Sequence, residues 1–384
     1  MNKKLLALAV AAALAPAAAM ADSGNVTIYG VMDASYDITD NGNGATTPGG
    51  AVANGTRTNK VSSNNGRIGF KGNEDLGNGL SAIWQVESTV FVDQGSDTLG
   101  TRNTFVGLSS KTAGTLGLGR NDTPYKSSTR AYDYFTDGLA DNRNLMGKGL
   151  IAFDQRPSNT VFYVSPNMSG FVGSIAYVAG AEGATASGDK KGDAWSLSGN
   201  YANGPLTAAL AYERHKFGSV SSMVASGGAN TPFGASLTTF GATAADVAAI
   251  VGSTEKAWKL GVGYTFGDLM VNGVYEKTSD DFNIFDHKAY TLGAKYKIGS
   301  NDLKLAYIKA GDLGDVSQTS AKQWALGVDH HTSKRTKVFA QYVKLSNDTN
   351  ATYGLTGAAA SGSVAAKGFD ADPSAWSFGM RHTF

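Results

Sequence analysis

The chain has 384 residues, with 33 basic and 32 acidic side chains and no cysteine. This balance gives no bulk electrostatic reason to bind nucleic acid, and the lack of cysteine excludes disulfides and thiolate metal sites. Glycine is abundant, at 49 residues, without a collagen period, and the mean hydropathy of −0.18 would on its own suggest a soluble protein.

The first 21 residues have the pattern of a secretory signal peptide. Two lysines precede an uncharged run from Leu5 to Ala21, which ends in a small-residue cleavage site. The most apolar part is too short to span a bilayer, and Pro16 interrupts the run after it. We expect cleavage before Asp22, so that residues 22–384 form one domain. Its formal charge is −1, because the removed segment carries two lysines and no acid.

The rest of the chain alternates between apolar and polar residues. The alternation is clearest in four segments, at residues 26–35, 257–266, 290–298 and 323–329. In residues 257–266, Trp258, Leu260 and Val262 share one face, and Lys259 and Gly261 lie on the other. Each segment predicts a β-strand with one apolar and one polar face.

A soluble β-sandwich and a membrane β-barrel both produce such strands. We count about sixteen candidate strands, more than one sandwich normally holds, and many end in aromatic residues. The connections between strands alternate in length. Longer ones fall near residues 38–63, 91–101, 121–157, 180–192, 215–254, 279–287, 310–321 and 346–373. Short turns at one rim and long loops at the other are typical of an outer-membrane barrel, so we predict an all-β antiparallel barrel with an aqueous lumen.

The last nine residues have the pattern of a final strand. Even positions from Trp376 to Phe384 are mostly aromatic or apolar, and Phe384 ends the chain. Such a strand would close the barrel against the first one and remove the sheet edges. An ordinary terminal strand is the alternative.

Seven segments carry a resemblance to a known family. They are residues 26–33, 66–72, 74–80, 102–108, 118–120 and 156–166, and the terminal Phe384. In these segments the chain resembles the general porins of Gram-negative bacteria, especially those of β-proteobacteria. The matches are dense up to about residue 215, sparse through the loops beyond, and clear again at the end.

The resemblance implies a fold, a location and a set of partners. The fold would be a 16-stranded antiparallel transmembrane barrel with short periplasmic turns, long external loops and a third loop folded into the lumen. The protein would be a homotrimer in the outer membrane, among lipid and lipopolysaccharide, and Phe384 would be the signal for the barrel-assembly machinery. Its activity would be passive diffusion of small hydrophilic solutes, without a cofactor and without enzymatic chemistry.

Arginines at matching family positions are the candidates for the pore constriction. Arg67, Arg102 and Arg156 match a basic cluster on the barrel wall, and the alternation places each opposite lipid-facing neighbours. An arginine facing lipid at the midplane would cost about 2–4 kcal/mol, which favours the lumen. Solvated arginines at the rim are the alternative. Arg120 also matches, but its position in the alternation puts it just past the lipid-facing stretch. Val31 stands where enteric porins carry a lysine.

The opposing acids should come from the long connection at residues 121–157. Asp133, Asp137 and Asp141 recur every four residues, which would place them on one face of a short helix. Facing the arginines, they would set a transverse field across the pore. Three solvated loop acids are an equally good interpretation, and the spacing lacks the close oxygen ligands of a calcium loop.

We therefore predict a water-filled pore with weak anion preference. A substrate-specific channel for sugars, phosphate or organic acids on the same barrel is the main alternative. A barrel enzyme and an adhesin are more remote, because the five histidines lack an accompanying nucleophile motif.

Overall fold

The computed structural model describes residues 25–95, 98–149, 152–180, 192–217, 252–283, 285–356 and 361–384. The predicted signal peptide lies outside these residues. The strands that build the wall are β1 (Val26–Asp40), β4 (Arg57–Ser63), β5 (Arg67–Gly77), β6 (Leu80–Thr89), β7 (Thr104–Ser110), β8 (Gly114–Arg120), β9 (Thr160–Val164), β10 (Phe171–Ala179), β11 (Asp193–Asn203), β12 (Leu206–Lys216), β13 (Thr254–Phe266), β14 (Leu269–Asp280), β15 (His287–Ile298), β16 (Asn301–Ala310), β17 (Ala321–His331), β18 (Thr336–Asn347) and β19 (Ser374–Thr383).

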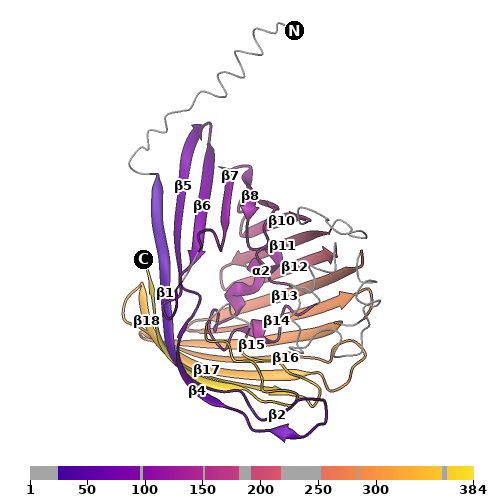
Figure 1. Cartoon of the computed structure of the whole chain (residues 1–384). Coiled ribbons are helices and arrows are strands. Elements are labelled where there is room, and N and C mark those ends of the chain that lie inside the picture. Colours follow the sequence, from indigo (N-terminus) through magenta and orange to yellow (C-terminus); the bar gives the residue numbers. More distant parts are fainter. Residues whose placement is uncertain are drawn as a thin grey trace.

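These strands close into the predicted 16-stranded antiparallel barrel (Figure 1). The count is sixteen because β4 and β5 both pair with β1 and together form one interrupted span. Closure is made by β1 and β19, which pair from Val31–Thr383 to Asp40–Ser374. Phe384 completes the seam by exchanging backbone hydrogen bonds with Gly30, at 3.0 and 3.1 Å. The predicted pairing of the last strand with the first is therefore confirmed.

The period-two alternation sets the two faces of the wall. In β13, Trp258, Leu260 and Val262 are exposed on the outside, whereas Ala257 and Lys259 point inward and are buried. Tight turns join the strands at one end of the barrel, for example between β13 and β14, and longer loops join them at the other end. Six of those longer loops contain residues that lie outside the described ranges.

Among the described residues, the helical elements lie in the segment between β8 and β9, which we call loop 3 (residues 121–159). They are α2 (Pro124–Thr129) and the 3-10 helices η1 (Arg130–Tyr132) and η2 (Asn142–Asn144). Figure 1 shows α2 surrounded by the strands of the barrel, and it contacts β10 to β13. Within the described residues, no helix has the length and hydropathy needed to cross a bilayer. The short strands β2 (Gly44–Ala45) and β3 (Val52–Ala53) form a hairpin in the first loop.

An apolar core lies between loop 3 and the inner wall. It joins Phe135, Leu139 and Leu145 of the loop to inward-facing residues such as Ile308 and Val343. Loop 3 is therefore folded into the lumen, as predicted, because burial of this apolar surface stabilises it there.

Candidate pore constriction

Loop 3 enters the lumen through a capped helix. Thr123 accepts a hydrogen bond from the backbone N–H of Lys126 at 3.2 Å, and Pro124 occupies the first helical turn, where its missing N–H costs nothing. The two ends of the loop are also joined, because the backbone N–H of Thr123 donates to the carbonyl of Gln155 at 3.2 Å. The loop therefore starts and ends at one place on the wall.

Buried polar contacts fix the middle of loop 3 to the far wall. Glu276 of β14 accepts from the Tyr125 hydroxyl and from the backbone N–H of Gly147, both at 2.7 Å. Gln323 of β17 accepts from Asn144 at 2.7 Å and donates to the carbonyl of Ala140 at 2.9 Å. Because each buried partner would be costly to leave unpaired, these contacts hold the loop in one position.

The returning arm of loop 3 rests on a buried histidine. The ring of His215 stacks on Phe153 with centroids 4.6 Å apart, and its two nitrogens lie 2.9 Å from Glu213 and 2.7 Å from Glu255. Both nitrogens are therefore used in wall contacts. This histidine serves as a support for the loop and has no free nitrogen to act as a base.

Three aromatic rings of loop 3 sit against glycines of the wall. A Cβ at Gly261 would lie 3.0 Å from Tyr132, one at Gly293 would lie 3.2 Å from Tyr134, and one at Gly327 would lie 2.8 Å from Phe135. Only a residue without a side chain leaves room for such close approach. The distance of loop 3 from the wall, and hence the bore, depends on these glycines.

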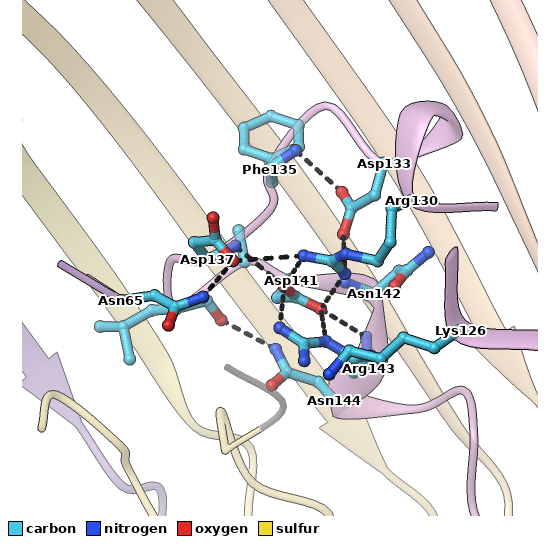
Figure 2. Close-up of polar contacts among 12 residues, drawn as sticks. Asn65, Lys126, Arg130, Asp133, Phe135, Asp137, Asp141, Asn142, Arg143 and Asn144 are labelled. Atoms are coloured by element: carbon cyan, nitrogen blue, oxygen red, sulfur yellow. Dashed lines mark hydrogen bonds and ion pairs between the residues drawn. The ribbon is translucent and has the colours of Figure 1, made fainter. Parts of the chain in front are cut away.

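The predicted loop acids converge on one arginine of the same loop. Figure 2 shows Arg130 between Asp133, Asp137 and Asp141, at 3.9, 3.4 and 3.1 Å. The predicted helix across these acids is wrong: η1 ends at Tyr132, and Asp137 has a φ of 71°. The loop winds around Arg130 instead, because the three carboxylates neutralise its half-buried guanidinium.

The three acids have different tasks. Asp133 accepts from the backbone N–H groups of Phe135 at 2.8 Å and Asn142 at 2.9 Å. Asp141 is fully buried and binds Arg143 through both oxygens, at 2.9 and 2.8 Å. These two acids therefore fold the loop and do not face the opposite wall.

Asp137 is the acid that reaches the wall arginines. Its carboxylate lies 3.4 Å from Arg381 of β19 and 3.9 Å from Arg67 of β5, and it accepts from Asn65 at 2.7 Å. Val31 is buried and pairs with Arg67 across the β1–β5 ladder, so no basic side chain occupies that place. The structure thus places Arg67 and Asp137 at ion-pair distance from each other.

The other predicted arginines bind neighbouring acids, amides, carbonyls or hydroxyls, and Arg156 lies near the end of loop 3 and not on a wall strand as predicted. Arg102 is buried, 2.5 Å from Glu87 and 2.5 Å from the Asn65 amide oxygen. Arg156 lies 3.1 Å from Asp122. Arg120 donates to the Thr101 carbonyl at 3.2 Å and to Ser158 at 3.0 Å, and forms no ion pair among the described residues.

Sequence reasoning missed several charged groups of this site. They are Glu87, Asp33, Asp122, Lys126, Arg130, Arg143, Lys148 and Arg381. The alternation of β19 could have found Arg381, since Phe378 and Met380 take the lipid-facing positions. The charges of loop 3 have no such signal, because the loop has no period.

Burial and neighbouring charges shift the pKa values of loop 3. Burial and the nearby negative charge of Asp141 together raise the pKa of Asp133 to about 6. Burial also lowers the pKa of Lys126 to about 8, and burial together with Arg143 lowers the pKa of Lys148 to about 8. For Arg130, burial opposes the charged form, but the three aspartates outweigh it and raise the pKa. Near neutral pH the loop therefore keeps most of its basic charges, and Asp133 is the acid of the loop that gains a proton when the pH falls toward 6.

A closed barrel with an inward loop, and with charged side chains between that loop and the wall, is the geometry of a diffusion pore. A profile of the Gram-negative porins matches residues 7–351 of the chain. The chain belongs to the Gram-negative porin family. It is an outer-membrane protein that crosses the membrane with its strands and forms a channel for passive diffusion.

Individual porins are similar over much of the chain. Outer membrane porin protein 32 of Delftia acidovorans is 29% identical over 366 residues, which cover 92% of each chain. The major outer membrane protein P.IB of Neisseria meningitidis serogroup B is 33% identical over 225 residues, 56% of this porin and 60% of that protein.

Solved structures have the same fold. An anion-selective porin from Comamonas acidovorans superimposes with a TM-score of 0.71 at 25% identity and covers 94% of this chain and 99% of its own. OmpT of Vibrio cholerae in its trimer form has a TM-score of 0.64 at 17% identity, over 94% and 99% of the two chains. The latter shows likeness of fold alone.

Proposed function

We propose that this porin prefers anions, and that the constriction between loop 3 and the β1–β9 wall sets the preference. The basic side chains there are Arg67, Arg102, Arg120, Lys126, Arg130, Arg143, Lys148, Arg156 and Arg381. The acidic ones are Asp33, Glu87, Asp122, Asp133, Asp137, Asp141 and Asp154. The excess of basic groups over acids is the observation that carries the proposal, since the net charge at the narrowest section selects the ion.

The raised pKa of Asp133 enlarges this excess, because that carboxyl is partly protonated near pH 6. Most of the charges form pairs, so the net field is smaller than the number of arginines suggests. We therefore infer a weak preference. The similar Comamonas porin is described as anion-selective, which supports the same sign.

Liposome swelling tests this proposal. Vesicles containing the purified porin are diluted into separate solutions of a monovalent organic anion, a neutral sugar or an organic cation of similar size, and the rates of swelling are compared. The proposal predicts entry of all three, with the anion fastest and the cation slowest. Equal rates for anion and cation would contradict it. A rate that saturates with one solute would instead indicate a substrate-specific channel.

We also propose the assembly and partners that the family resemblance implies: a homotrimer that contacts outer-membrane lipid and lipopolysaccharide. Phe384 would be recognised by the barrel-assembly machinery. Its ring is 44% exposed at the end of the closing strand, where a partner could reach it. Light scattering of the detergent-solubilised protein should give three times the mass of one chain, and a single-chain mass would contradict the trimer.

A further inference from the structure

A row of lysines follows the outside of the barrel at its loop end. Each of six consecutive strands, β13 to β18, carries one exposed lysine in this row. We call these residues the lysine belt: Lys256, Lys277, Lys288, Lys309, Lys322 and Lys344. The alternation shows that they point outward, because Lys256 shares its face with Trp258 and Leu260.

An aromatic row lies directly below the belt. Two residues nearer the middle of each strand stand Trp258, Tyr275, Tyr290, Tyr307, Trp324 and Tyr342. Neighbouring rings touch: the centroids of Trp258 and Tyr275 are 5.3 Å apart, and those of Tyr307 and Trp324 are 4.5 Å apart. Aromatic girdles mark the headgroup level of a membrane barrel, so the belt lies at the depth of the headgroups.

The belt brings like charges together. Lys277 of β14 is the direct partner of Lys288 of β15, and Lys309 of β16 is the direct partner of Lys322 of β17. Like charges directly opposite on a sheet repel. A bound anion between the two ammonium groups of each pair would remove this repulsion.

No acid of the described chain takes that place. None of the six lysines forms an ion pair with a described residue. Arg214, which continues the same row on β12, shows the contrast, because Asp193 binds it at 2.9 Å. Beyond Arg214 no described acid therefore pairs directly with a lysine of the belt, although the charge of Asp286 acts on Lys256 and Lys277 at longer range.

We propose that the lysine belt binds the phosphate groups of lipopolysaccharide in the outer leaflet. The belt faces the membrane and not the lumen, so the anion that reaches it is carried by a lipid. Lysine is a common phosphate ligand, and basic residues at the membrane surface bind anionic headgroups. The acyl chains would lie along the apolar surface below the aromatic row. This inference rests on the location of the porin in the outer membrane.

Binding of fluorescent lipopolysaccharide to the detergent-solubilised porin tests the proposal. Two variants each remove one opposed pair: Lys277→Gln with Lys288→Gln, and Lys309→Gln with Lys322→Gln. The matched control is Lys111→Gln with Lys334→Gln, in turns at the opposite end. Each lysine removed should weaken binding about fivefold, so each belt variant should lose roughly 25-fold and the control close to nothing.

Two further arms identify the ligand group. Lipopolysaccharide whose lipid phosphates have been removed should bind the unaltered porin as weakly as the intact lipid binds a belt variant. Inorganic phosphate at millimolar concentration should not displace the lipid. Displacement would indicate a free-phosphate site, and either equal binding of the dephosphorylated lipid or equal losses in belt and control variants would overturn the proposal.

Bilayer conductance separates this inference from the proposed function. The belt lies outside the lumen, so the belt variants should keep the conductance and ion preference of the unaltered porin. Lost lipid binding with unchanged conductance supports the belt. Altered ion preference in the belt variants would contradict the placement of selectivity in the constriction.

Discussion

Neutralising Asp137 should strengthen the anion preference of the pore. Asp137 is the loop acid that touches both Arg67 and Arg381, and Asn65 donates to it at 2.7 Å. In Asp137→Asn the new amide oxygen still accepts from Asn65, and Arg130 keeps Asp133 and Asp141. The fold of loop 3 should therefore survive, while one negative charge disappears and three arginines, Arg67, Arg130 and Arg381, lose an acid.

The size of the effect can be worked out from Coulomb's law. A unit charge about 5 Å from a monovalent ion in a water-filled pore contributes about 0.8 kcal/mol. Screening at 0.1 M salt, where the Debye length is about 10 Å, reduces this to about 0.5 kcal/mol. Anion and cation experience opposite signs, so their permeability ratio should change by about 1 kcal/mol, or roughly fivefold toward the anion.

The assay is the reversal potential across a planar bilayer under a salt gradient. Asp268→Asn is the matched control, because it removes the same charge in an exposed turn between β13 and β14. It should leave the reversal potential unchanged. A shift of Asp137→Asn toward cations, or equal shifts in both variants, would refute the reasoning.

Three further predictions concern the same constriction. Arg102→Gln should shift the permeability ratio toward cations and lower the free energy of unfolding by about 3–5 kcal/mol, because it leaves Glu87 buried without its cation; unchanged selectivity would remove Arg102 from the site. The anion preference should fall as the pH rises from 5 to 9, since Asp133, with a pKa raised by burial to about 6, loses its proton first. Lys126 and Lys148, with pKa values lowered by burial to about 8, lose their charge next. A reversal potential that does not change with pH would contradict the role of these three groups in ion preference. Gly327→Ala should reduce single-channel conductance, because the new Cβ would lie 2.8 Å from Phe135 and push loop 3 into the bore. Gly173→Ala, whose Cβ would meet its nearest neighbour at 3.6 Å, is the control; equal conductance in both would argue against the glycine contacts.

The barrel was predictable because its physics is local. Each strand must point apolar side chains at lipid, so the alternation in β13 and β17 is visible without any partner strand. The same logic placed Arg67 in the lumen and predicted closure at Phe384. It would also have found Arg381, had the alternation of β19 been followed to its inward face.

Loop 3 was less predictable because its conformation depends on distant residues. Its position is fixed by Glu276 and Gln323, which lie more than a hundred positions further along the chain. The four-residue spacing of its acids suggested a helix, but the half-buried charge of Arg130 draws all three carboxylates around one point. A pattern of charges in a loop does not show which partner will neutralise them.

The reversal potential of the unaltered porin tests the central claim most directly. The purified protein is inserted into a planar bilayer that separates two potassium chloride solutions differing tenfold in concentration, at neutral pH. Potassium and chloride are suitable because the two ions have nearly equal mobility in water. A weakly anion-preferring constriction gives a modest potential with the sign set by chloride. A strong potential with the sign set by potassium would show that the acids dominate the constriction and would contradict the central claim.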